Sequence, residues 1–233
     1  MYASASTWLF NAARAVATEL APTTLYRSIY LETLWHLSRL PTGQVIVKTH
    51  HLTPYLARFM EGNSARILIS IRDPRDAVTS LMQHMGQNFP NALRQVERSA
   101  CFCSRYAKRD KSFLFVYEAN FTERPETFDL LAQAFDGVLS PAARQKLSLS
   151  STRQAVEAQI ARLESLPTSW RNPTNGDLVD TETQWHIHHG GRTGAQGRWR
   201  NFLSDDAVRE IEQRLAGFMA EFGYPASATL RKE

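Results

Sequence analysis

The segment LISIRDPRDAVTS, at residues 68–80, places a guanidinium and a hydroxyl at a spacing that can hold one phosphate group. Residues 67–71 are apolar and mostly β-branched, which predicts a buried strand. An Asp-Pro pair then supplies a helix N-cap and a first helical residue. The strand would bring Arg72 to the edge of a parallel sheet, with Ser80 two turns along the next helix. From this segment alone, an anion site and an ordinary pairing of Arg72 with a carboxylate stay equally open.

A second reactive group lies at the end of a short predicted strand at residues 44–48. Lys48 and His50 are two residues apart, so in an extended chain their side chains share a face. The His50 imidazole titrates near neutral pH and is a candidate general base. The Lys48 ammonium can stabilise charge that develops on a leaving group. His51 is an alternative base, and a solvated loop is the competing interpretation of this segment.

Two more segments carry groups that suit an anion. Residues 4–8 read SASTW and offer hydroxyls at the expected start of a helix, where backbone N–H groups also bind phosphate. Residues 192–202 read RTGAQGRWRNF, in which glycines allow close backbone approach and arginines bind phosphate bidentately. The sequence contains no G-x-x-x-x-G-K-[S/T], which argues against an ATP-hydrolysing P-loop, and it lacks an obvious magnesium-binding pair, which disfavours a nucleotide-dependent kinase.

In their order along the chain, these segments resemble the PAPS-dependent sulfotransferases. The family binds the 3′-phosphate with an Arg-x-Pro-x-Asp motif and a later serine, which Arg72, Pro74, Asp76 and Ser80 match. Four further segments resemble the phosphosulfate loop, the catalytic strand end, the adenine-side strand and the C-terminal loop of the family; they are residues 4–8, 47–50, 116–118 and 192–202. The resemblance spans nearly the whole chain.

The resemblance implies an α/β fold of three αβα layers around a central parallel sheet, similar to the P-loop nucleoside triphosphate hydrolases. It implies a sulfotransferase that moves a sulfuryl group from PAPS to a hydroxyl or amine of a small-molecule or carbohydrate acceptor. Lys48 and His50 would act at the transferred group, without a metal, and PAP would be the product. The cofactor-binding residues would be Ser4, Ala5, Ser6, Thr7, Trp8, Arg72, Ser80, Tyr117, Arg192, Thr193 and Gly194.

The sequence departs from the family at three positions. The family has Lys or Arg where Ala3 stands, Gly where Ala5 stands, and often Lys where Thr193 stands. A phosphate loop also needs a preceding strand, and none is visible before residue 2. A start assigned too late, a shortened chain or another element in that place would each account for this. The alternative function is therefore a degenerate, non-catalytic relative that binds a nucleotide or a partner.

Composition narrows the class of protein. A chain of 233 residues predicts one domain, and its net charge of +4 suits an anionic ligand. No Lys/Arg-rich run, transmembrane-length apolar stretch or signal peptide is visible, so neither nucleic acid nor a membrane span is expected.

Cys101 and Cys103 point to different faces of a predicted helix, which favours reduced thiols and the cytoplasm. Histidines at 186, 188 and 189 lack a neighbouring Cys or carboxylate cluster, which disfavours a metal site.

Apolar runs at 44–48, 67–71 and 113–117 alternate with helical patterns, which predicts a parallel sheet that is covered on both faces. The helical patterns include residues 24–40 and one long helix at 205–222. Residues 167–197 are polar and turn-rich, and we expect an active-site loop there. Aromatic and histidine side chains in the expected acceptor loops suit a sugar or an aromatic acceptor equally. The acceptor and the oligomeric state stay open.

Overall fold

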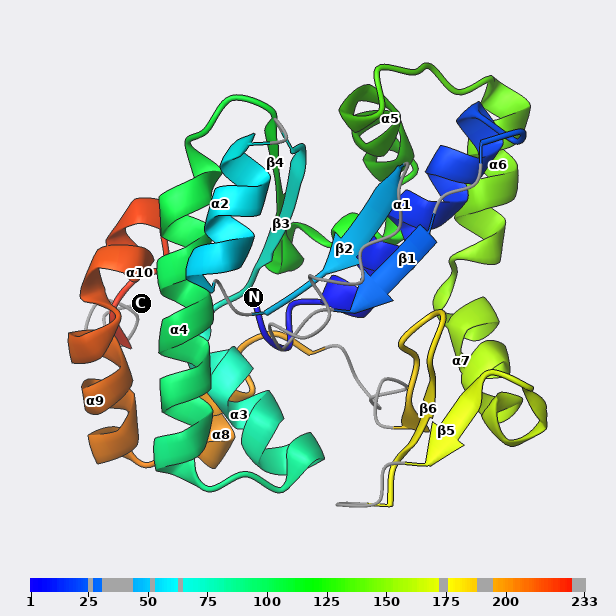
Figure 1. Ribbon diagram of the computed structural model, residues 1–233. Coiled ribbons are helices and arrows are strands. Elements are labelled where there is room, and N and C mark those ends of the chain that lie inside the picture. Colours follow the sequence, from blue (N-terminus) through cyan, green and yellow to red (C-terminus); the bar gives the residue numbers. More distant parts are fainter. Residues whose placement is uncertain are drawn as a thin grey trace.

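The computed structural model describes residues 1–24, 27–30, 44–50, 53–62, 65–171, 176–187 and 195–227 (Figure 1). The helices are α1 (Ser6–Leu20), α2 (Pro54–Gly62), α3 (Pro74–Met85), α4 (Phe89–Ala107), α5 (Glu126–Ala134), α6 (Pro141–Ser150), α7 (Arg153–Ala161), α8 (Trp199–Phe202), α9 (Asp205–Arg214) and α10 (Ala216–Phe222). The strands are β1 (Arg27–Tyr30), β2 (Val45–Lys48), β3 (Ile67–Ile71), β4 (Ser112–Val116), β5 (Ser169–Arg171) and β6 (Leu178–Asp180). Short 3₁₀ turns follow β4 at Tyr117–Ala119 and Phe121–Glu123, and another lies at Leu163–Ser165.

The strands form three pairs. β1 and β2 are parallel, with Arg27 opposite Val45, and β3 and β4 are parallel, with Ile67 opposite Ser112. β5 and β6 form an antiparallel hairpin. β2, β3 and β4 confirm the three strands that the sequence predicted at residues 44–48, 67–71 and 113–117.

Helices cover both faces of the β3–β4 pair. Ile67, Ile69 and Ile71 pack into one apolar cluster with residues of α3, α4, α9 and α10. Leu68 and Phe115 contact a second cluster that contains residues of α1 and α5. Alternate β3 side chains therefore enter different cores, as the two-residue period of a strand requires. The result is the expected arrangement of three αβα layers.

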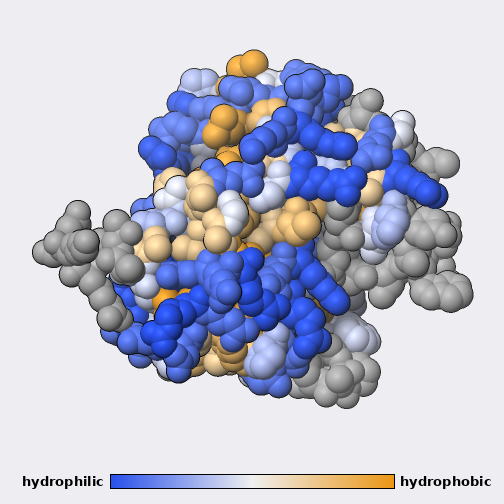
Figure 2. All heavy atoms as spheres, turned by 90° about the vertical axis from the view of Figure 1, so that its left-hand side faces the viewer, coloured by the Kyte–Doolittle hydropathy of each residue, from blue (hydrophilic) through white to orange (hydrophobic). Residues whose placement is uncertain are grey.

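Outer helix faces are polar. Figure 2, which views the side of α4, α9 and α10, shows hydrophilic side chains over much of this surface and an apolar strip between them. α9 has buried Val208 and Ile211, whereas Arg214 pairs with Glu97 of α4 on the surface. Within the described ranges, no helix is both long and apolar enough to cross a membrane.

Three expectations about secondary structure need correction. Residues 27–30 form strand β1 rather than part of a helix, because their backbone pairs with β2; residues 31–43 lie outside the described residues. The long C-terminal helix is two helices, α9 and α10, separated at Leu215, whose φ of −111° is not helical. The polar region 167–197 contains the β5–β6 hairpin as well as loops. Both missed strand pairings depend on a partner that local propensity does not reveal.

Candidate functional site

The end of β2 contacts the first turn of α1. Lys48 Nζ donates a hydrogen bond to Thr7 Oγ1 at 2.6 Å, and both side chains are buried. β2 ends at Lys48, and α1 begins at Ser6, so the contact joins two segments that are 41 residues apart. A buried ammonium beside the N-terminus of a helix is well placed to meet an anion.

His50 lies against the loop before α1 and against the first residue of that helix. Its Nε2 is 2.9 Å from Ser6 Oγ, and the Tyr2 ring stacks on the imidazole with centroids 4.2 Å apart and an interplanar angle of 15°. The imidazole is thus held at one edge by a hydroxyl and on one face by a ring. Tyr2 was not among the expected site residues, and its only signal in the sequence is an aromatic ring just before the serines of the loop. His51 lies outside the described residues.

The loop before α1 has an unusual backbone. Ala3 has a φ of 54° and Ala5 a φ of 58°, both in the left-handed region. Ala5 is the N-cap of α1, and its side chain makes no cap hydrogen bond. The Cβ of an L-residue is crowded in this conformation, which glycine adopts freely. The position at which the resemblance implies glycine is therefore one at which the backbone favours glycine.

Ser4 and Trp8 face inward. Ser4 is fully buried, and its hydroxyl lies 2.7 Å from the carbonyl oxygen of Met1 and 2.8 Å from Ser70 Oγ of β3. Trp8 Nε1 donates to the carbonyl of Ser151 at 2.8 Å, and the indole packs in the second apolar cluster. Both side chains hold the loop and α1 in place, and their contact with a nucleotide stays a prediction.

Arg72 lies where the N-terminal and C-terminal loops meet. It follows β3, is 5% exposed, and donates to the carbonyl oxygens of Ala3 and Ala195, each at 3.1 Å. Its guanidinium carbon is 4.3 Å from the centroid of the Tyr117 ring, and one nitrogen is 3.8 Å from Asp76 Oδ2. Among the described residues, no hydrogen-bond partner is found for the buried Nε of Arg72. A buried cation with an unsatisfied donor is a candidate anion site.

Asp76 fixes the C-terminal loop to α3. Its carboxylate accepts hydrogen bonds from the backbone N–H of Gly197 at 2.6 Å and of Trp199 at 3.0 Å. Arg192, Thr193 and Gly194 lie outside the described residues. The described part of the C-terminal loop begins at Ala195, whose carbonyl oxygen accepts from Arg72. Ser80 is half-buried in α3.

The turn that presents Arg72 is held from two sides. Asp73 caps α3 by accepting from the backbone N–H of Arg75 at 2.9 Å, which confirms the expected cap. Glu118 Oε1 accepts from the backbone N–H of Asp73 at 2.8 Å, and Glu118 Oε2 accepts from the Tyr224 hydroxyl at 3.0 Å. Burial raises the pKa of Glu118, and burial together with the Glu118 charge raises the pKa of Tyr224. Tyr224 was not foreseen from the sequence.

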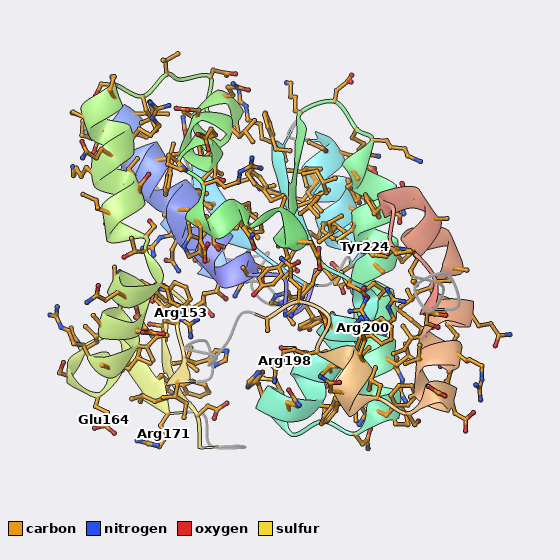
Figure 3. The ribbon with its side chains drawn as sticks, turned by 180° about the vertical axis from the view of Figure 1, so that it is seen from behind. Arg153, Glu164, Arg171, Arg198, Arg200 and Tyr224 are labelled. Atoms are coloured by element: carbon orange, nitrogen blue, oxygen red, sulfur yellow. The ribbon has the colours of Figure 1, made fainter. Side chains whose placement is uncertain are left out.

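Figure 3 places the remaining labelled side chains. Arg198, Arg200 and Tyr224 lie on the side of α3 and α4, whereas Arg153, Glu164 and Arg171 lie around α7 and the β5–β6 hairpin.

No group of three or more potential metal ligands occurs in the part of the chain that is described. His186 belongs to that part, and His188 and His189 do not.

Solved structures share this fold. Mouse sulfotransferase SULT7A1, in complex with PAP, superposes with a TM-score of 0.64 at 13% identity, over 93% of this chain and 80% of that chain. The fold is that of a sulfotransferase. Retinol dehydratase in complex with androsterone and the inactive cofactor PAP gives a TM-score of 0.51 at 18% identity, over 79% of this chain and 56% of that chain. No family model matches the sequence, and no curated protein matches it. The sulfotransferase fold confirms the fold class that the motif order implied.

Proposed function

We propose that the protein is a PAPS-dependent sulfotransferase that acts on a hydroxyl or amine of a small-molecule or carbohydrate acceptor. The observation that carries this proposal is the buried Arg72 guanidinium, whose Nε lacks a partner among the described residues at the junction of both loops. The sulfotransferase fold, shared with proteins solved in complex with PAP, supports the same nucleotide here.

The nucleotide would be held at both of its phosphate ends. Arg72, Ser80 and the loop that carries Arg192, Thr193 and Gly194 would bind the 3′-phosphate, with Tyr117 under the Arg72 guanidinium. The hydroxyls of Ser6 and Thr7 and the N-terminus of α1 would bind the 5′-phosphosulfate. Ser4, Ala5 and Trp8 would contribute backbone and packing to that loop.

The reaction would run in line at sulfur. The acceptor oxygen or nitrogen forms a bond to sulfur as the bond from sulfur to the bridging phosphate oxygen breaks, which releases PAP. His50 would take the proton of the acceptor, and Lys48 would stabilise the charge that builds on the leaving phosphate. Lys48 contacts Thr7 and His50 contacts Ser6, so both groups lie at the first turn of α1. Because this scheme uses no metal ion, we expect EDTA to leave turnover unchanged.

Binding of PAP, measured by calorimetry, tests the nucleotide site. We expect Arg72→Ala to weaken PAP binding more than tenfold, because a charge-assisted contact is lost. Arg171→Ala is the matched control: Arg171 is exposed on the β5–β6 hairpin (Figure 3), and its loss leaves PAP binding unchanged. Equal affinity of Arg72→Ala and the unmutated protein would show that Arg72 is not the 3′-phosphate ligand.

Transfer from ³⁵S-labelled PAPS to a panel of phenols, alcohols, sugars and amines tests catalysis. We expect His50→Ala to abolish transfer while PAP binding persists, and His51→Ala to retain transfer. The reverse result would assign the base to His51. PAP binding without transfer to any acceptor would favour the non-catalytic relative that Ala3 and Ala5 motivate.

Both cysteines are free thiols, with Cys101 exposed and Cys103 buried. Free thiols fit a reducing compartment, and we propose the cytoplasm as the place of action. We also propose that residues 1–233 form one sulfotransferase domain.

A further inference from the structure

Two of the groups that contact the His50 imidazole differ in what the proposed function asks of them. Ser6 Oγ lies 2.9 Å from Nε2, and the Tyr2 ring covers one face of the imidazole, with centroids 4.2 Å apart and planes 15° apart. The His50 side chain itself is buried. In the proposed function the Ser6 hydroxyl also binds the 5′-phosphosulfate, whereas the Tyr2 ring has no second task.

The contact with Ser6 competes with the proposed chemistry. A histidine that takes a proton from the acceptor must present an unprotonated ring nitrogen. When the Ser6 hydroxyl donates to Nε2, Nε2 is that nitrogen, and the hydrogen bond occupies it. An oxygen of the phosphosulfate accepts from the same hydroxyl. Cofactor binding therefore frees Nε2 for the acceptor, and it also removes a bond that fixes the imidazole.

The stack on Tyr2 does not compete in this way. The nitrogen lone pairs of His50 lie in the plane of the imidazole, so a ring on its face leaves them open to the acceptor. The χ2 torsion of histidine is broad and roughly two-fold, so an imidazole without such support rotates easily. Rotation would turn its edge into the Tyr2 ring, which lies nearly parallel to it. The stack therefore limits the rotation that the loss of the Ser6 bond permits.

The chain next to Tyr2 is anchored away from His50. The carbonyl oxygen of Ala3 accepts from Arg72 at 3.1 Å, and the Ser4 hydroxyl lies 2.8 Å from Ser70 Oγ of β3. The Tyr2 ring thus extends from a segment fixed at the end of β3 to a residue that follows β2. This support for the imidazole comes from outside the first turn of α1, where the proposed function places the phosphosulfate.

We propose that Tyr2 is a positioning residue, whose ring keeps the His50 imidazole in one orientation while the Ser6 hydroxyl is engaged with the nucleotide. The role of His50 as the base rests on the proposed function, whereas the stack is testable without any substrate. The role belongs to the flat ring and not to the phenol hydroxyl, so phenylalanine should replace Tyr2 and leucine should not.

NMR of the histidine ring signals tests the stack in the full chain. Ser6→Ala removes the hydroxyl without any need for a nucleotide, and loss of a signal in His50→Gln identifies that of His50. We expect Ser6→Ala to keep one narrow His50 Hε1 signal, shifted upfield by the Tyr2 ring. Adding Tyr2→Leu should move this signal downfield and broaden or split it, and adding Tyr2→Phe should not. Identical His50 signals in all three proteins would overturn the proposal.

Steady-state transfer from PAPS tests the consequence for turnover. In the otherwise unmutated chain, we expect Tyr2→Leu to lower kcat at least about tenfold, because a small displacement of a catalytic group has a large effect on rate. The KM for PAPS and the affinity for PAP should stay unchanged, and Tyr2→Phe should restore kcat. An unchanged kcat in Tyr2→Leu, or a fall that Tyr2→Phe shares, would overturn the proposal.

Failure of the proposed function gives a different result. An unmutated protein that transfers no sulfuryl group to any acceptor contradicts the proposed function. The NMR comparison then still decides whether Tyr2 holds the imidazole, since it uses neither PAPS nor an acceptor.

Discussion

The Lys48 ammonium donates to Thr7 Oγ1 at 2.6 Å, which couples the end of β2 to the helix that follows the N-terminal loop. The loop itself has Ala3 at the position where the resemblance implies a cation. A positive charge still reaches the helix N-terminus, but it comes from a neighbouring strand. The charge of the candidate site is therefore built from segments that are distant in sequence.

Lys48→Met removes this charge and keeps most of the side-chain volume. We expect PAP affinity, measured by calorimetry, to fall about tenfold, since a Coulombic contact with the 5′-phosphate is lost. Thr7→Val is the companion variant, because it removes only the hydroxyl and retains the ammonium, and we expect it to lower affinity less. A larger effect of Thr7→Val than of Lys48→Met would assign the dominant contact to the hydroxyl.

Ala5→Gly should stabilise the protein. Ala5 has a φ of 58°, and a left-handed conformation costs an L-residue about 1 kcal/mol, part of which glycine regains. Urea denaturation should show a higher midpoint with an unchanged slope. Ala15→Gly, in the interior of α1, is the control and should lower stability by about 1 kcal/mol. If both substitutions raise the free energy of unfolding, or both lower it, the strain that we assign to Ala5 is contradicted.

Asp76→Ala should loosen the C-terminal loop. It leaves the backbone N–H groups of Gly197 and Trp199 without their acceptor, which we expect to cost about 3 kcal/mol in the free energy of unfolding. PAP affinity should fall as well, since the same loop contacts Arg72. Asp129→Ala removes an ion pair with Arg144 in which the two side chains are 38% and 40% exposed, so it should change stability by less than about 1 kcal/mol and leave PAP binding intact. Wild-type stability of Asp76→Ala would argue against the carboxylate as the anchor.

Glu118→Gln should change how stability depends on pH. Burial raises the pKa of Glu118 above its ordinary value of 4.5, so the folded protein binds this proton more tightly than the unfolded chain. The contribution of Glu118 to stability is then full below the ordinary pKa and is lost as pH rises through the raised pKa. Gln keeps an acceptor for the Asp73 N–H and carries no charge.

We therefore expect Tm of the unmutated protein to fall relative to Glu118→Gln as pH rises from about 4 to 7. Thermal unfolding across this pH range measures the difference directly. Glu123→Gln, at an exposed position in the next 3₁₀ turn, is the control for the loss of one carboxylate from this region. A constant difference between Glu118→Gln and the unmutated protein at all pH values would contradict the raised pKa.

Local signals accounted for the centre of the site. The apolar run of β3, the Asp73 cap and the helix after Pro74 depend on neighbouring residues, and the structure has them as the sequence predicted. Residues 27–30 were predicted as helix because their pairing with β2 is not visible in a local pattern. Tyr224 was missed for the same reason, since its hydroxyl meets Glu118 across 106 positions of sequence. The motif order predicted the fold, whereas the stacking of Tyr2 on His50 required the structure.

The contacts of Arg72 and Asp76 also set the time at which the candidate site can form during synthesis. Arg72 meets Ala195 across 123 positions, and Asp76 meets Gly197 across 121 positions. A nascent chain that ends before this loop contains β3, α3 and the guanidinium, but it lacks the segment that covers them. The candidate anion site can therefore form only after residues 195–199 have been synthesised, although β3, α3 and the Arg72 guanidinium are made much earlier.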